Sequence, residues 1–132
     1  MKRSGTSLIF VNDHNQVLLF LRDDKPDLPY RNMWDVLGGH IDPDETPEEC
    51  IIREMKEEID LNLKDFQLLC CKEFDDRIEY TYWKKANLII ENINLMEGQR
   101  LKWFTRQEAA ETELAYGFNE IVEEFFKSKY LH

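Results

Sequence analysis

GGHIDPDETPEECIIREMKEEIDL, residues 38–61, contains the clearest helix signal in this chain of 132 residues. Thr46 is a residue type that caps helix N-termini, and Pro47 suits the first helical position. Acidic residues crowd the start, where the helix dipole is positive. The pattern predicts a helix that begins at Pro47 and continues to about Ile59. The glycine pair before it permits backbone conformations that other residues avoid.

The predicted helix carries an apolar face and an acidic face side by side. At about 100° per residue, four apolar side chains share one arc and are predicted to be buried: Ile51, Ile52, Met55 and Ile59. Glu54, Glu57 and Glu58 occupy the neighbouring arc, where only Lys56 interrupts them and Arg53 precedes them. A solvated acidic face is one explanation. The other is a site for a divalent cation such as Mg²⁺, which prefers oxygen ligands and relieves repulsion among the glutamates.

The spacing of the segment matches a known pattern. Gly39 is followed after five residues by Glu45, and after seven more by Arg53-Glu54-Met55-Lys56-Glu57-Glu58-Ile59-Asp60-Leu61. This resembles the signature of the Nudix hydrolases, G-x5-E-x7-R-E-U-x-E-E-x-G-U, in which U is aliphatic. Asp60 replaces the family's usual glycine, but aspartate tolerates the left-handed conformation that follows a helix end. Leu37 stands where relatives often have proline, which should affect loop stiffness more than chemistry.

The resemblance implies a fold and a reaction. The fold is an α/β/α sandwich, a mixed β-sheet flanked by helices, and the reaction is hydrolysis of a nucleoside diphosphate linked to a group X. Water attacks one phosphorus of the pyrophosphate bridge while Mg²⁺ or Mn²⁺ lowers the pKa of that water. In the family, glutamates that match Glu54, Glu57 and Glu58 bind the metal, often with the backbone carbonyl at the position of Gly38.

The same resemblance implies supporting roles for Glu45 and Arg53 in the catalytic machinery. An arginine can hold a glutamate in its working orientation through paired hydrogen bonds. The general base differs among relatives, and both Glu54 and Glu57 are candidates.

An EF-hand is the competing metal site, since Asp42 and Asp44 are spaced as at the start of a calcium loop. The sixth position of that loop would be Pro47 where glycine is required. The twelfth would be Arg53 where glutamate is required, so the calcium loop is rejected.

The rest of the chain alternates strand and helix patterns, which favours a single α/β domain over residues 1–132. Strands are predicted at 6–11, 17–21, 68–74, 79–90 and 101–104, and residues 33–37 should re-enter the core. Helices are predicted from about Thr105 and Tyr116 onward. The segment 23–32 carries two prolines among charged residues and should be an exposed loop. This order predicts a mixed sheet with helices on both faces.

Several residues outside the pattern are further candidates for the site. Glu97, on a predicted loop, is either a metal ligand or an ordinary exposed acid, and Glu79 competes for the same role. Arg22 and Arg31 could contact substrate phosphates, although surface solubility explains them as well. Asn119 lies in a short segment similar to an Asn-Glu pair of MutT-type members. Its amide could read a purine edge, or it could simply start a helix.

Composition limits the classes of partner. The net charge of −10 and the absence of a basic run argue against long nucleic acids, because nothing would displace counterions from a phosphate backbone. No stretch approaches the ~18 apolar residues of a membrane span, and no secretory segment is evident, so a cytoplasmic location is expected. Cys50, Cys70 and Cys71, an odd number without Cys-x-x-Cys spacing, are expected to be buried and reduced. A homodimer is left open.

The pocket for X has no fixed pattern, so the sequence decides little about the substrate, which should be a small nucleotide. ADP-ribose-cleaving relatives typically carry a proline downstream of the signature, and this chain has none after Pro47. Its short length favours a MutT-like nucleoside triphosphate pyrophosphohydrolase, with 8-oxo-dGTP or a related nucleotide as substrate. Nucleotide sugars and dinucleoside polyphosphates are alternatives. A catalytically silent, nucleotide-sensing Nudix module is another, although such modules usually lose glutamates that this chain keeps.

Overall fold

A computed structural model describes residues 2–131 of the chain. Within this range seven strands form one sheet: β1 (Arg3–Val11), β2 (Val17–Leu21), β3 (Trp34–Asp35), β4 (Leu37–His40), β5 (Gln67–Glu73), β6 (Arg77–Lys85) and β7 (Arg100–Phe104). The α-helices of the same range are α1 (Pro47–Ile59), α2 (Arg106–Ala110) and α3 (Asn119–Lys127). Short 3₁₀ turns lie at Ile90–Asn92, Ala115–Gly117 and Lys129–Leu131.

Strand β1 is the centre of the sheet, because it pairs with β6 along one edge and with β4 and β2 along the other. β1 and β6 run parallel, with Arg3 opposite Arg77 and Val11 opposite Lys85. The other pairings are antiparallel. The main path of the sheet has the order β3-β2-β1-β6-β5. The mixed sheet predicted from the sequence is therefore confirmed.

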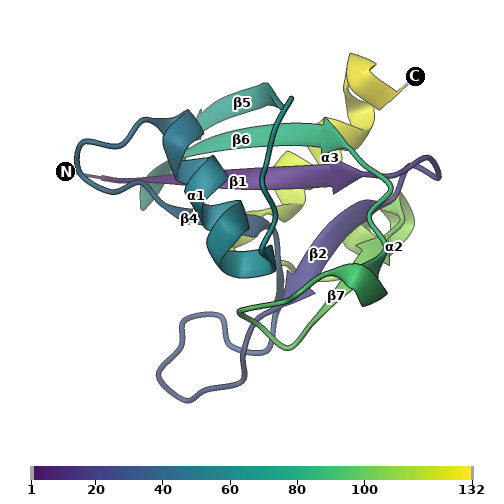
Figure 1. Cartoon of the computed structure of the whole chain (residues 1–132), viewed down its shortest axis with the longest axis horizontal. Helices are drawn as coiled ribbons and strands as arrows, with labels where there is room; N and C mark the ends of the chain where they lie inside the picture. Colours follow the sequence, from purple (N-terminus) through teal and green to yellow (C-terminus); the bar gives the residue numbers. More distant parts are fainter. Residues whose placement is uncertain (1, 132) are drawn as a thin grey trace.

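Helices cover both faces of this sheet, and Figure 1 shows α1 in front of β1 and α3 behind it. Successive residues of β1 point to opposite faces. Leu8 and Phe10 pack in the same apolar core as α1, whereas Ile9 and Val11 pack in the core that contains α2 and α3 residues. Because both sets are buried, residues 8–11 of this strand form a continuous apolar run. The predicted α/β/α sandwich is confirmed.

Helix α1 begins where the sequence predicts. The Thr46 side chain accepts a hydrogen bond from the Glu49 backbone N–H, and the Glu49 side chain accepts one from the Thr46 backbone N–H. This capping box satisfies two backbone donors that the helix itself cannot pair. The predicted buried face is wrong in one place, since Ile52 is 42% exposed. Cys50 and Glu58 are buried instead, because they lie on the side of α1 that rests on β4 and β1.

Helix α1 ends at Asp60, which adopts the left-handed conformation (φ 53°, ψ 43°) predicted for this position. The backbone N–H groups of Asp60 and Leu61 donate to the carbonyl oxygens of Lys56 and Met55, and these bonds close the helix end. The Asp60 carboxylate also forms a surface ion pair with Lys56 at 2.7 Å. Aspartate therefore fills the place of the family's glycine without changing the turn.

We expect Asp60→Gly to change the free energy of unfolding by less than about 1 kcal/mol, because glycine enters the left-handed region freely and an exposed ion pair contributes little. Asp60→Val should lower it by about 1–2 kcal/mol, since a β-branched side chain is strained there. Urea denaturation of both variants measures the difference. Equal stabilities would contradict a conformational constraint at this position.

The strand predicted over residues 79–90 ends too late and is corrected by the structure. β6 stops at Lys85, which is the partner of the last β1 residue, Val11. The Ala86 N–H still donates to the Val11 carbonyl oxygen. The chain turns after Val11, so no further β1 residue is available to pair with this edge of β6. The apolar residues that follow form the 3₁₀ turn Ile90–Asn92 instead.

The last helix begins later than predicted. Tyr116 has a left-handed backbone (φ 57°, ψ 19°) inside the turn Ala115–Gly117, and Gly117 has φ 70°. Two left-handed residues in succession interrupt a right-handed helix, so α3 begins only at Asn119.

The cysteines are less buried than predicted. Cys50 is buried, but Cys70 is half-buried and Cys71 is exposed, and each of the three is a free thiol. Cys70 and Cys71 belong to β5, which pairs only with β6 and therefore lies at an edge of the sheet. Neighbouring residues of an edge strand point to opposite faces, and one of those faces is open to solvent here.

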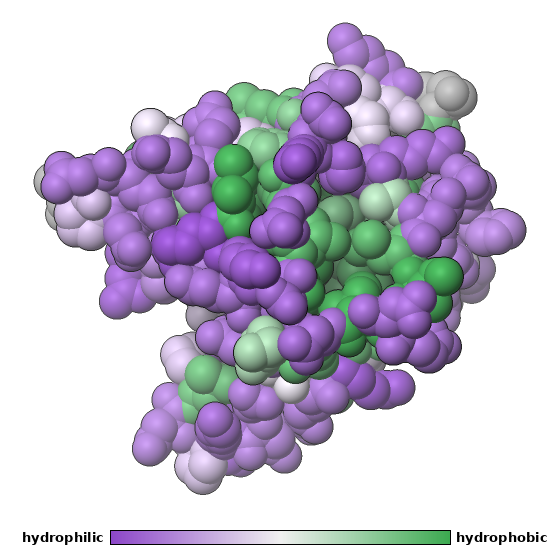
Figure 2. All heavy atoms as spheres, viewed as in Figure 1, coloured by the Kyte–Doolittle hydropathy of each residue, from purple (hydrophilic) through white to green (hydrophobic). Residues whose placement is uncertain are grey.

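Hydrophilic residues cover most of the surface seen in Figure 2, and apolar residues gather near the middle of that face. Residues 2–131 include no helix with the length and apolar character needed to cross a membrane. The large apolar and aromatic side chains that are exposed are Tyr30, Ile52, Leu68, Ile89 and Met96. They come from separate elements and loops, so they do not form the apolar stripe of a single helix.

Candidate active site

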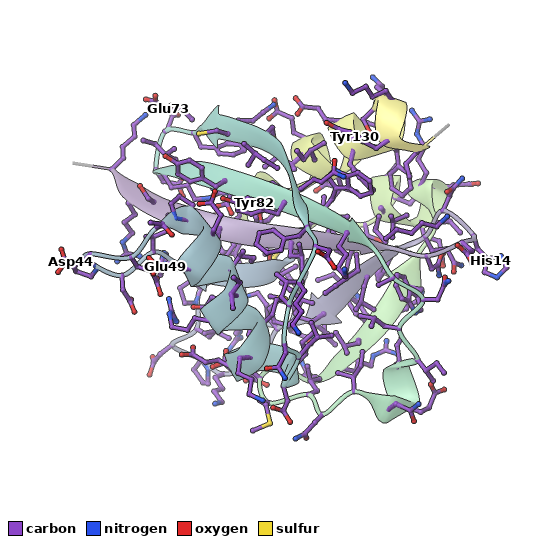
Figure 3. All side chains as sticks on the ribbon, turned by 45° about the horizontal axis from the view of Figure 1, so that its top comes forward. His14, Asp44, Glu49, Glu73, Tyr82 and Tyr130 are labelled. Atoms are coloured by element: carbon purple, nitrogen blue, oxygen red, sulfur yellow. The ribbon has the colours of Figure 1, made fainter. Side chains whose placement is uncertain are left out.

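A cavity of about 410 Å³ lies where α1 approaches β1, β4 and β6. Acidic side chains from α1, glycines from β4, and arginines with aromatic rings from other segments all line it. Figure 3 shows Asp44 and Glu49 at the end of the molecule where the chain enters α1, far from His14 at the other end. Carboxylates, glycines, and arginines with aromatic rings thus line the same cavity.

Gly38 and Gly39 allow close approach inside this hollow. Gly38 (φ 150°) lies opposite Ser7 of β1, and a Cβ on it would come within 2.0 Å of the Thr6 carbonyl oxygen. A Cβ on Gly39 would come within 2.3 Å of the Glu54 carboxyl carbon. The first glycine is thus required by the backbone of the sheet, and the second leaves room for a carboxylate.

Arg53 joins the loop before α1 to the carboxylates of the helix. Its Nε and Nη2 donate to the two oxygens of Glu45 at 2.7 and 3.0 Å, a paired geometry. Its Nη1 donates to Glu54 at 3.0 Å and to Glu57 at 3.1 Å. Its Nη2 also donates to the His40 carbonyl oxygen at 3.0 Å. The hydrogen bond from Arg53 lowers the pKa of Glu45 to about 2, so this support stays ionised.

Glu54 and Glu58 are carboxylates held away from water. Burial raises the pKa of Glu54 to about 7, with the Arg53 charge as the main opposing influence. Burial, followed by repulsion from Glu54, raises the pKa of Glu58 well above its ordinary value, although the Gly38 N–H donates to it at 2.8 Å. Glu97 adds further repulsion at both sites. Such a cluster is stabilised by any cation that enters the cavity.

The donor chemistry of this cluster fits Mg²⁺ or Mn²⁺, which prefer carboxylate oxygens. Within residues 2–131, however, no three His, Cys, Asp or Glu side chains converge as a finished metal site. Two of the carboxylates, Glu54 and Glu57, are instead turned to Arg53, which donates hydrogen bonds to both. The Glu57 side chain is 53% exposed, so it can turn toward a cation without unpacking the core.

The structure brings both Glu97 and Glu79 to the cavity. The Met96 N–H donates to the Glu58 carbonyl oxygen at 2.8 Å, which ties the Glu97 loop to the end of α1. Glu79 is only 3% exposed, and its carboxylate accepts a hydrogen bond from Arg77 Nε at 2.7 Å. Because Glu79 already has a cationic partner, Glu97 is the better candidate for a further metal ligand.

The three candidate substrate-binding residues are not brought together. Arg22 lines the cavity, and its Nη1 donates to Asp35 at 3.1 Å. Arg31 lies outside the lining and forms an exposed ion pair with Asp24 at 3.7 Å. Asn119 also lies outside it, and its amide hydrogen-bonds backbone groups of Ala109, Thr112 and Leu114. The structure therefore favours the helix-start role for Asn119 over a base contact, since its side-chain amide serves the turn before α3.

Comparison with known proteins decides the family, because the NUDIX domain model matches residues 1–125. This chain belongs to the NUDIX family. An RNA pyrophosphohydrolase of Pseudomonas fluorescens strain SBW25 is 34% identical to it over 103 residues, which are 77% of this chain and 58% of that protein. The chain thus spans less than two thirds of the length of this relative.

Solved Nudix structures have the same fold. A MutT NUDIX hydrolase from Burkholderia pseudomallei superposes with a TM-score of 0.78 at 22% identity, over 94% of this chain and 98% of that chain. The NUDIX domain of Shewanella oneidensis NrtR, complexed with ADP ribose, superposes with a TM-score of 0.78 at 17% identity, over 96% of this chain and 88% of that chain. The Nudix resemblance of residues 39–61 is confirmed.

Other residues that line this Nudix cavity were not predicted from the sequence, among them Asp35, Arg77, Tyr116 and Phe118. Arg77 and Glu79 carry opposite charges two positions apart on β6, and this alternation was the one available signal that they share a face. Tyr116 and Phe118 come from a turn whose conformation no motif predicts. Their place in the cavity depends on the packing of that turn.

The buried carboxylate of Asp35 should make the stability of this Nudix domain depend on pH. Burial raises its pKa to about 6 from the ordinary value of 3.8, although Arg22 opposes the shift. The folded protein then binds this proton more tightly than the unfolded chain. The resulting stabilisation is complete below about pH 4 and is lost as the pH rises through about 6. A shift of roughly two units corresponds to at most about 3 kcal/mol.

Asp35→Asn isolates this effect, because asparagine does not titrate. Relative to the variant, the free energy of unfolding of the parent protein should fall by about 2–3 kcal/mol between about pH 4 and pH 7. Urea denaturation at several pH values measures this difference. A difference that stays constant over the range would contradict a raised pKa for Asp35.

Proposed function

We propose that this chain is a hydrolase that cleaves a pyrophosphate bridge within a nucleotide, by attack of water on one phosphorus. The observation that carries the proposal is the cluster of desolvated carboxylates on α1 beside a 410 Å³ cavity. Membership of the NUDIX family supports the same class of reaction, as does the name of the RNA pyrophosphohydrolase that resembles this chain. The reaction needs no protein nucleophile.

Glu54, Glu57 and Glu58 would hold Mg²⁺ or Mn²⁺, with the Gly38 carbonyl oxygen and Glu97 as further oxygen ligands. When bound, the ion makes the attacking water more acidic and offsets charge on the leaving group. Glu58 is already fixed by the Gly38 N–H, so it offers a preformed ligand on the helix. Glu57 would leave part of its contact with Arg53 when the ion binds.

Arg53 and Glu45 act as supports for this chemistry. The paired hydrogen bonds between them hold the guanidinium, which in turn orients Glu54 and Glu57. Glu54 and Glu57 are also the two candidates for the base that accepts the proton of the attacking water. Gly39 contributes by leaving space for the Glu54 carboxylate.

The first candidate substrate is a free nucleoside triphosphate such as 8-oxo-dGTP, which would yield a nucleoside monophosphate and pyrophosphate. The second is the 5′-triphosphate end of an RNA, which the name of the 34% identical relative favours. Both present the same 5′-polyphosphate to the carboxylates, and the cavity volume suits one nucleotide. The net charge of −10 predicts few contacts with an RNA chain beyond its terminal nucleotide.

A panel of nucleotides incubated with the protein and Mg²⁺ tests the proposal. It should contain 8-oxo-dGTP, the ordinary nucleoside triphosphates, a nucleotide sugar, a dinucleoside polyphosphate and a short 5′-triphosphate RNA. We expect at least one to release phosphate products, and we expect EDTA to abolish the release and added Mg²⁺ or Mn²⁺ to restore it. Binding without hydrolysis of any member would instead favour the nucleotide-sensing module. A cytoplasmic location stays a prediction, and the oligomeric state stays open.

A further inference from the structure

The cavity has a second lining whose chemistry differs from that of the glutamates. Arg22, Arg77, Tyr116 and Phe118 all belong to it. They come from the loop that follows β2, from β6 and from the turn before α3, so segments far apart in the sequence meet here. Cationic groups beside aromatic rings form a surface suited to a flat, electron-rich ligand group.

Arg77 is fixed by several contacts before any ligand binds. It is only 7% exposed, its Nε donates to Glu79 at 2.7 Å, and its Nη2 donates to the Tyr116 carbonyl oxygen at 3.1 Å. Its guanidinium carbon lies 4.3 Å from the centre of the Phe74 ring and 5.2 Å from that of Phe118. Because Glu79 balances its charge, Arg77 is better suited to position the Tyr116 turn than to bind a phosphate.

Tyr116 is held in a conformation that tyrosine rarely adopts, and the bond from Arg77 to its carbonyl oxygen stabilises that conformation. The half-buried ring contacts two neighbours. The Tyr30 ring centre lies 4.4 Å away, tilted by 49°, and the Arg22 guanidinium carbon lies 5.3 Å away. Tyr30 is 46% exposed and belongs to the loop between β2 and β3, so this contact lies at the protein surface.

We propose that Tyr116, positioned by Arg77, is the surface on which the nucleobase of the substrate stacks. The inference rests on the proposed function, since it takes a nucleotide as the ligand. The polyphosphate is drawn to cations held by the acidic helix, so the base must occupy another part of the same cavity. Aromatic rings bind bases of every kind through their faces, and Tyr116 lines this cavity while its ring contacts that of Tyr30.

Steady-state kinetics of Tyr116→Ala test the proposal. Loss of stacking should raise KM roughly 5- to 100-fold and leave kcat within about threefold, because the base is far from the bond that breaks. Tyr116→Leu, which keeps apolar bulk without an aromatic face, should behave like Tyr116→Ala, and Tyr116→Phe should behave like the parent. Tyr130→Ala is the matched control, since this half-buried tyrosine packs near the C-terminus outside the cavity lining (Figure 3). An unchanged KM in Tyr116→Ala overturns the proposal.

Equilibrium binding separates this proposal from the proposed function, because it needs no hydrolysis. Guanosine and adenosine 5′-monophosphate, titrated by calorimetry in EDTA, should bind Tyr116→Ala at least about fivefold more weakly than the parent. Ribose 5-phosphate, which lacks a base, should bind both proteins equally. If the parent hydrolyses nothing but the variant loses nucleotide affinity, stacking stands and the hydrolase is rejected. Normal hydrolysis with equal nucleotide affinity rejects stacking alone.

Arg77→Lys tests the positioning role. Lysine keeps a charge beside Glu79 but cannot bond Glu79 and the Tyr116 carbonyl with a planar fork. We expect a rise in KM with little change in kcat, and no further rise when Arg77→Lys is added to Tyr116→Ala, because both changes remove the same contact. Additive effects of the two substitutions would overturn the link between Arg77 and Tyr116.

Discussion

Glu57→Gln is expected to lower turnover by about 10²- to 10⁴-fold on whichever substrate the panel identifies, while leaving the fold unchanged. A neutral amide is a weaker ligand for a hard cation than a carboxylate, and it cannot accept a proton from water. The Glu57 side chain is 53% exposed and contacts Arg53 on the surface, so its replacement should not disturb the core. Steady-state kinetics measure the loss, and circular dichroism checks the fold.

Glu91→Gln is the matched control for this change. Glu91 is exposed in the 3₁₀ turn Ile90–Asn92 and lies outside the cavity lining, so the same chemical substitution should leave turnover within about twofold. Turnover that stays normal in Glu57→Gln would reject the assignment of the metal to the acidic face of α1. A similar loss in both variants would point to a general effect of charge.

Gly39→Ala is expected to lower activity by about 100-fold with little loss of stability. The added Cβ would lie 2.3 Å from both the carboxyl carbon and Oε1 of Glu54, so the carboxylate must move. A shift of about 1 Å in a catalytic group is enough to reduce the rate by two orders of magnitude. The obstructed atoms are the end of a flexible side chain, so the backbone of β4 need not change. Kinetics and thermal unfolding together measure the two effects.

The neighbouring Gly38→Ala should show the opposite balance. Its Cβ would lie 2.0 Å from the Thr6 carbonyl oxygen and 2.7 Å from the Ser7 Cα, and Gly38 has a φ of 150° that other residues rarely adopt. Backbone atoms of β1 cannot move aside, so we expect the free energy of unfolding to fall by about 2–5 kcal/mol. Two adjacent glycines would thus divide their effects between stability and catalysis. Equal losses of stability in both variants would contradict this division.

Residues 38–61 show which features could be predicted from the sequence. The helix start at Pro47, the capping residue Thr46 and the left-handed Asp60 all follow from short-range rules, and the structure confirms each. The pairing of Arg53 with Glu45 has the geometry expected from the family pattern. Local rules succeed here because each interaction joins residues at most a few turns apart along the chain.

The errors have a common physical origin. Ile52 is exposed and Glu58 is buried, because contact with β4 decides which side of α1 faces the core. The strand after Glu79 ends early because its partner, β1, ends. For Asn119 the sequence left a helix start and a base contact open, and the structure favours the first, since the carbonyl and N–H groups that it bonds are brought together only by the packing of α2 against α3. In each case a distant segment overrides the local pattern.

By itself the sequence determined the family and the helix that carries the glutamates, because these depend on spacing within one short segment. Only the tertiary structure decided that Arg77, Tyr116 and Asp35 complete the cavity. Their positions follow from the parallel pairing of β6 with β1 and from a left-handed turn before α3. Contacts between segments so far apart depend on the packing of the whole domain, which no spacing rule encodes.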